Sequence, residues 1–191
     1  MESTRDQILD AANRLFYAEG VRAVSVDAVA EQAKITKKTL YYHFRSKDDL
    51  IAAYLESRDQ PNLAAFKRWF DGAEGDLADR VAAIFAGLSK ASRHPKWRGC
   101  GFLRTIAELA AMPGHPAVRV GAAHKKKFEA WLAEEMQTAL GDPARAAILA
   151  RHIVLLMDGA FSAMLTHRDP AYVDEAGHAA RQLVEAAGRA E

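Results

Sequence analysis

The 191-residue sequence has a single cysteine, Cys100, and no long hydrophobic run. One thiol cannot form an internal disulfide, and it excludes a zinc site built from several cysteines. The longest uninterrupted apolar stretch, residues 81–86, is far shorter than the roughly 20 residues that cross a bilayer. The first residues carry acids and lead into no apolar segment, so they do not resemble a secretory signal. We therefore expect a cytoplasmic protein that does not enter a membrane.

Alternating β-branched stretches are also missing, and apolar residues recur instead at spacings of three and four. This pattern predicts an all-α protein of about nine helices. The first should start after Ser3 or Thr4 and end at Gly20, and the second should follow Ser25. The third should start at Thr36 and run to about residue 44. A fourth, capped by Ser46, should be broken or bent at Pro61. Further helices are predicted at residues 77–92, 102–112, 117–140, 144–166 and 171–188.

The formal net charge of +1 says nothing about nucleic acid, but the charges are unevenly placed. Residues 34–47 contain five lysines or arginines and no acid, with acids on either side. Phosphate binding depends on such a local basic surface rather than on the total charge. Taken alone, however, a basic run is more often a solvated helix face.

Three short helices separated by tight turns, the third basic and aromatic, are typical of a helix-turn-helix. Residues 33–36 supply the short turn between the second and third helices. The third helix would bury Leu40 and Phe44 and expose side chains that can reach nucleic acid. Thr36, Lys37 and Lys38 would then face base edges, whereas Tyr41 and Lys47 would hold phosphates. Free backbone N–H groups after Ser25 would add a phosphate contact.

The segment Thr-Leu-Tyr-Tyr-His-Phe at residues 39–44, followed by Ser-Lys-Asp-Asp-Leu at residues 46–50, resembles the N-terminal domain of TetR-family regulators. The resemblance covers about residues 5–52. It implies an all-helical fold of nine or ten helices, with a helix-turn-helix DNA-binding domain at residues 1–47 and a helical ligand-binding and dimerisation domain at residues 48–191.

The resemblance also implies roles for particular residues. Those facing the major groove would be Thr36, Lys37, Lys38 and Tyr42, and those touching the DNA backbone would be Ser25, Thr39, Tyr41, His43 and Lys47. Three alternatives stay open. Lys38 stands where many relatives have glycine or alanine, Tyr42 could pack against the first helix, and His43 could cover the end of its own helix.

The last two predicted helices carry apolar and small residues that allow close helix approach. Two copies of each could form a four-helix interface with two-fold symmetry. The alternative is that these helices cover only their own core. A homodimer is favoured, partly because the family resemblance implies one.

A ligand pocket is expected among the later helices. Its candidate lining residues are aromatic or apolar, with two polar groups that could orient a ligand: Phe66, Trp69, Phe85, Trp97, Phe102, Ile106, Glu108, His124, Phe128, Trp131, Met157 and Phe161. Aromatic and methionine side chains at helical spacing, however, more often belong to the ordinary core. No metal-ligand spacing and no nucleophile–base pair is visible, so we expect no metal, no cofactor and no catalytic site.

These observations predict a sequence-specific transcriptional regulator: a homodimeric repressor on a palindromic double-stranded DNA operator, released by a small hydrophobic or aromatic effector. The alternative is a protein that binds or sequesters small molecules and carries a vestigial DNA-binding unit.

Overall fold

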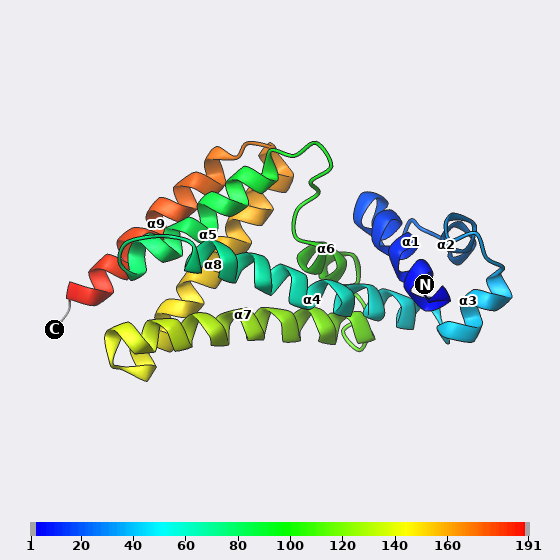
Figure 1. Cartoon of the computed structure of the whole chain (residues 1–191), viewed down its shortest axis with the longest axis horizontal. Coiled ribbons are helices and arrows are strands. Elements are labelled where there is room, and N and C mark those ends of the chain that lie inside the picture. Colours follow the sequence, from blue (N-terminus) through cyan, green and yellow to red (C-terminus); the bar gives the residue numbers. More distant parts are fainter. Residues whose placement is uncertain (1–2, 190–191) are drawn as a thin grey trace. The chain divides into compact units, whose positions relative to one another are not determined.

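The computed structural model describes residues 3–189, and these residues form helices and turns without any strand. The nine helices of this described part of the chain are α1 (Thr4–Glu19), α2 (Val26–Gln32), α3 (Lys37–His43), α4 (Lys47–Asp71), α5 (Leu77–Ser92), α6 (Gly101–Glu108), α7 (Pro116–Leu140), α8 (Pro143–His167) and α9 (Ala171–Arg189) (Figure 1). The predicted all-α class is confirmed.

Side-chain caps fix the helix starts, at the predicted Ser3, Ser25 and Thr36 and also at Asp76. Ser3 and Asp6 form a capping box at α1, and Asp76 forms another with Asp79 at α5. The hydroxyls of Ser25 and Thr36 accept hydrogen bonds from backbone N–H groups in the first turns of α2 and α3. Each such bond satisfies a donor that has no partner inside the helix.

Two boundaries differ from expectation. Helix α4 is not broken at Pro61 but continues through it: Pro61 is exposed, while Leu55 before it and Leu63 after it are buried and hold the helix in place. Helix α6 ends at Glu108, four residues before the predicted end. Residues 109–115 instead form successive tight turns, which lead into Pro116 at the start of α7.

The chain divides into two compact units. The first comprises Met1–Pro61 and Cys100–His124, and so contains α1 to α3, α6 and the N-terminal parts of α4 and α7. Its core contains fully buried side chains from α1, α2, α3, α4 and α6: Ile8, Val29, Leu40, Leu50, Tyr54, Leu55 and Phe102. Burying a large apolar side chain contributes about 1.5–3 kcal/mol, so this core holds the short helices α2 and α3 in place.

The second unit comprises Asn62–Gly99 and Lys125–Glu191. Helices α5, α8 and α9 lie side by side in it (Figure 1), with α9 packed against both of the others. Gly177 of α9 allows the close approach to α5, because a Cβ there would lie 2.8 Å from the Cβ of Phe85. The two compact units are defined by packing and do not test the division of function predicted at residue 47, which stays a prediction.

Among residues 3–189, one helix is long and apolar enough to span a membrane by length and composition, namely α8. Of the most apolar 18-residue window of α8, 44% is buried inside the protein. The core helix of a soluble protein has the same properties, so this feature is weak evidence for a membrane.

Candidate DNA-binding interface

Helices α2 and α3 are joined by a turn that makes their geometry rigid. The N–H of Ile35 donates to the Ala30 carbonyl at 3.0 Å, and Lys34 takes a left-handed conformation with φ of 56°. Val29 and Leu40 are completely buried, and Phe44 is nearly so. This combination of a tight turn and a shared apolar seam fixes α3 against α2, as a helix-turn-helix requires.

The outer side of α3 is exposed and polar. Tyr42 is 85% exposed and Tyr41 43% exposed, and the ring of His43 stands edge-on to the Tyr42 ring at 5.2 Å between centroids. Lys38 lies on the same exposed surface. With its side chain almost fully in solvent, Tyr42 does not pack against α1. These side chains are therefore available to a duplex.

Four of the predicted contact residues at α2 and α3 form hydrogen bonds or an ion pair within the protein. The Lys37 ammonium lies 2.9 Å from the Asp27 carboxylate of α2, which raises the pKa of Lys37. Thr36 and Thr39 share a hydrogen bond of 2.8 Å between their hydroxyls. Ser25 accepts the N–H of Ala28 at 3.1 Å. Each hydroxyl also has a further hydrogen-bonding capacity that can serve a phosphate or a base.

Lys47 begins α4 beside the turn between α1 and α2. Its ammonium donates to the Arg22 carbonyl at 3.4 Å. Partial burial lowers the pKa of Lys47, and the carboxylates of Asp48 and Glu108 oppose that shift. Glu108 in turn accepts the backbone N–H of Arg22 at 2.9 Å. Lys47 is therefore held in a defined place rather than extended freely into solvent.

The predicted ligand residues fall into both units. In the first, the Phe102 and His124 rings stack at 3.7 Å, and His124 Nδ1 lies 2.7 Å from the Asp59 carboxylate. Ile106 faces Gly121, where an added Cβ would lie 2.7 Å from the Ile106 Cδ1. Glu108 is engaged with Arg22 as described.

In the second unit, the aromatic candidates form two groups. Phe66 lies 4.8 Å from Phe128 and 5.8 Å from Trp69, and Phe128 lies 5.8 Å from Trp131, measured between ring centroids. Trp97 stacks on Phe161 at 6.3 Å. Two other candidates, Phe85 and Met157, are buried. A ligand role for these residues stays a prediction.

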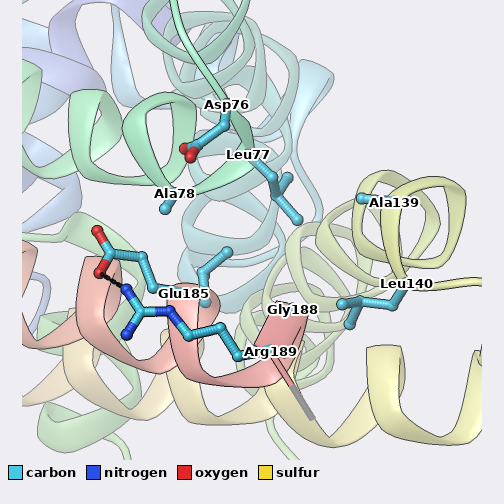
Figure 2. Close-up of a pocket in the computed structure, with 9 residues that line it drawn as sticks. Asp76, Leu77, Ala78, Ala139, Leu140, Glu185, Gly188 and Arg189 are labelled. Atoms are coloured by element: carbon cyan, nitrogen blue, oxygen red, sulfur yellow. Dashed lines mark hydrogen bonds and ion pairs between the residues drawn. The ribbon is translucent and has the colours of Figure 1, made fainter. Parts of the chain in front are cut away.

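An open pocket of about 480 Å³ lies elsewhere in the second unit, between the start of α5 and the ends of α7 and α9 (Figure 2). It is lined by Asp76, Leu77, Ala78, Ala139, Leu140, Val184, Glu185, Gly188 and Arg189. None of the predicted ligand residues is among them. Glu185 and Arg189 are paired with each other across 3.4 Å. Within residues 3–189, no group of three or more His, Cys, Asp or Glu residues could hold a metal ion.

The contacts of two residues at this interface, Asp27 and Glu108, could not be predicted from the sequence. Asp27 lies ten residues before Lys37, a separation at which no local sequence pattern indicates an ion pair. Glu108 was placed among ligand candidates, although its carboxylate binds the Arg22 N–H, 86 positions earlier in the chain. No local sequence signal reports a contact over that separation.

Comparison with known proteins agrees with this geometry. The family model "Bacterial regulatory proteins, tetR family" matches residues 8–54. The curated HTH-type transcriptional regulator SrpR of Pseudomonas putida is 40% identical over 60 residues, which are 31% of this chain and 28% of SrpR. The chain thus matches less than a third of the length of SrpR, and the likeness lies in less than a third of this chain.

Two solved structures match the chain over nearly its full length. A TetR-family transcriptional regulator from Streptomyces coelicolor has a TM-score of 0.84 and 33% sequence identity, covering 97% of this chain and 96% of that one. A putative TetR transcriptional regulator from Streptomyces avermitilis has a TM-score of 0.81 and 28% identity, covering 97% and 98%.

The fold and the exposed helix-turn-helix thus define a DNA-binding transcriptional regulator. The chain belongs to the TetR family. Because that is a family of regulators and not of enzymes, the chain is not an enzyme.

Proposed function

We propose that this chain is a cytoplasmic homodimeric repressor that binds a palindromic operator and is released by a small hydrophobic or aromatic effector. The observation that carries the proposal is the exposed outer side of α3, where Tyr42 is 85% exposed on a helix whose inner side is buried. An intact cap and a rigid turn accompany it. A vestigial DNA-binding unit does not need an exposed polar surface, a cap and a tight turn on α3, so these features favour a functional one.

The proposed contacts follow from position on the helix-turn-helix. Thr36, Lys37, Lys38 and Tyr42 would reach base edges in the major groove. Ser25, Thr39, Tyr41, His43 and Lys47 would bind the DNA backbone and set the register. Lys47 is the most defined of these, because its ammonium is already placed beside the Arg22 carbonyl.

An exposed apolar surface on α8 and α9 supports the homodimer. Ile148 and Leu155 of α8 are 55% and 63% exposed, and Gly159 lies one turn beyond Leu155 with open space around it. Tyr172 and Leu183 add exposed apolar area from α9. Exposed apolar side chains on two helices that pack together are typical of a protein interface, and a two-fold axis lets the same surface serve both copies.

Two recognition helices in such a dimer must lie about 34–36 Å apart, or a multiple of that distance, to read successive major grooves. An effector releases the dimer only if it binds a form with a different separation more tightly. The two aromatic groups of the second unit, around Phe128 and around Phe161, supply flat apolar surfaces for such a compound.

Gel-shift measurements with DNA from upstream of the chain's own gene test this proposal. We expect salt-sensitive, sequence-selective binding that is weakened by Tyr41→Phe and by Lys47→Ala. Size-exclusion chromatography with light scattering should report a dimer. A panel of hydrophobic and flat aromatic compounds should include one that raises the melting temperature and dissociates the complex. Sequence-blind weak binding would contradict the regulator and favour a sequestering role.

A further inference from the structure

Helix α6 presents two charged side chains to the helix-turn-helix. Arg104 and Glu108 are four residues apart and therefore share one side of the helix. The Arg104 guanidinium donates to the Tyr17 carbonyl, in the last turns of α1, at 2.8 Å. The Glu108 carboxylate accepts the backbone N–H of Arg22, in the turn between α1 and α2, at 2.9 Å. The end of α6 thus binds two backbone groups within five residues of each other.

Gly20 makes room for the Glu108 carboxylate. Its φ of 95° is a conformation that side chains other than glycine rarely adopt, and a Cβ there would lie 2.8 Å from Glu108 Oε1. The N–H of Gly20 closes α1 by donating to the Phe16 carbonyl. The turn is therefore shaped around the carboxylate, and the contact is more than a surface side chain lying across the backbone.

The residue Arg22 is held from both sides. Glu108 binds its N–H, and the Lys47 ammonium binds its carbonyl oxygen at 3.4 Å. Glu108 also acts directly on Lys47, because its carboxylate is one of the two that favour the charged ammonium. Glu108, the Arg22 backbone and Lys47 form one connected network, which we call the α6 clasp.

We propose that Glu108 is a positioning residue for DNA binding: through the α6 clasp it fixes the turn before α2 and places Lys47 for a phosphate. This inference rests on the phosphate contact proposed above for Lys47. It assigns Glu108 to the DNA-binding machinery and not to effector recognition, where the sequence had placed it.

The change in DNA affinity expected on loss of Glu108 is opposite in sign to the one that simple electrostatics gives. DNA is a polyanion, so removal of a carboxylate near the binding surface ordinarily strengthens binding. Loss of Glu108 should weaken binding instead, because the turn that holds Lys47 in place for a phosphate loses its support. Glu19 provides a matched control, since it is an exposed glutamate in the last turn of α1, close to Gly20.

The experiment compares Glu108→Ala, Glu108→Gln and Glu19→Gln in the full chain. The probe is a duplex selected by the wild-type protein from a random-sequence pool, titrated at several salt concentrations. We expect Glu19→Gln to bind as tightly as wild type or more tightly. Glu108→Ala should bind roughly tenfold more weakly. Its slope of log K against log salt should be shallower by about one phosphate contact. Glu108→Gln keeps an oxygen for the Arg22 N–H but loses the charge, so it should fall between the two.

A double-mutant cycle separates this route from general loss of structure. If Glu108 acts through Lys47, the variant Glu108→Ala/Lys47→Ala should bind no more weakly than Lys47→Ala alone. Additive losses would overturn the proposal, and so would tighter binding by both Glu108 variants. Should Glu108→Ala fail to fold, Glu108→Gln decides the result. If Lys47→Ala binds like wild type with an unchanged salt slope, the phosphate role proposed for Lys47 is itself wrong.

Discussion

The Lys37 ammonium and the Asp27 carboxylate lie 2.9 Å apart and tie the first residue of α3 to the first turn of α2. Asp27→Asn should release Lys37 and remove a negative charge near the DNA. We expect binding to random-sequence duplexes to become several-fold tighter and the salt slope to steepen by about one. The preference for the selected operator over random DNA should fall, because an untethered lysine meets any phosphate equally well.

Fluorescence anisotropy with both duplexes measures this effect. Glu31→Gln is the control, since Glu31 is an exposed acid of the same short helix. It removes the same charge and leaves the Lys37 pair intact. Equal changes in the two variants would mean that general electrostatics, and not the release of Lys37, accounts for the result.

Thr36 caps α3 through a hydrogen bond from the Thr39 N–H to its hydroxyl, 3.1 Å long. Thr36→Ala should lower the free energy of unfolding by about 1 kcal/mol, because it leaves that donor without its partner. Thr36→Ser keeps the cap and should be close to wild type in urea unfolding. Any loss of sequence selectivity that Thr36→Ser does show would then report the missing methyl group at a base edge.

The helix-turn-helix could be predicted from the sequence because its signals are local. Caps such as Ser25 and Thr36, the buried pair Leu40 and Phe44, and the short turn between the helices all lie within about 20 residues. Each depends on chemistry that acts between neighbours in the chain, such as a hydroxyl meeting an N–H three residues later. Helix class and most helix boundaries follow for the same reason.

The clasp around Glu108 could not be predicted, because it joins residues 86 positions apart. A glutamate on a short amphipathic helix is equally compatible with solvent, a ligand or a distant backbone N–H. The end of α6 was misplaced for a related reason: residues 109–112 have acceptable helix propensities, yet they turn because the following Pro113, Gly114 and Pro116 cannot continue the helix.

Leu155 lies 63% exposed on α8, within the surface proposed for the dimer. Leu155→Glu places a charge at the centre of an apolar interface and should convert the dimer to monomer in light-scattering measurements. DNA affinity should fall by at least about a hundredfold, because each half-site would then be bound independently. Ala86→Glu adds the same charge to an exposed position of α5 and should leave both properties unchanged. A Leu155→Glu variant that stays dimeric would place the interface on another surface.

Burial of Tyr54 makes folding stability depend on pH in the alkaline range. The phenol is 1% exposed beside Phe16, and its burial raises the pKa of Tyr54 from 10.0 to about 12. Between these values the unfolded chain loses this proton while the folded protein keeps it, so rising pH favours unfolding. This rise in the pKa of Tyr54 corresponds to about 3 kcal/mol of folding stability, which is present below pH 10 and fully lost above pH 12.

Urea unfolding of wild type and Tyr54→Phe at pH 8 to 11.5 isolates this contribution, since the other tyrosines and lysines titrate in both. The difference in stability between the two proteins should move in favour of Tyr54→Phe by 1–2 kcal/mol at the upper end of that range. A difference that does not change with pH would mean that the phenol titrates with its ordinary pKa in the folded protein.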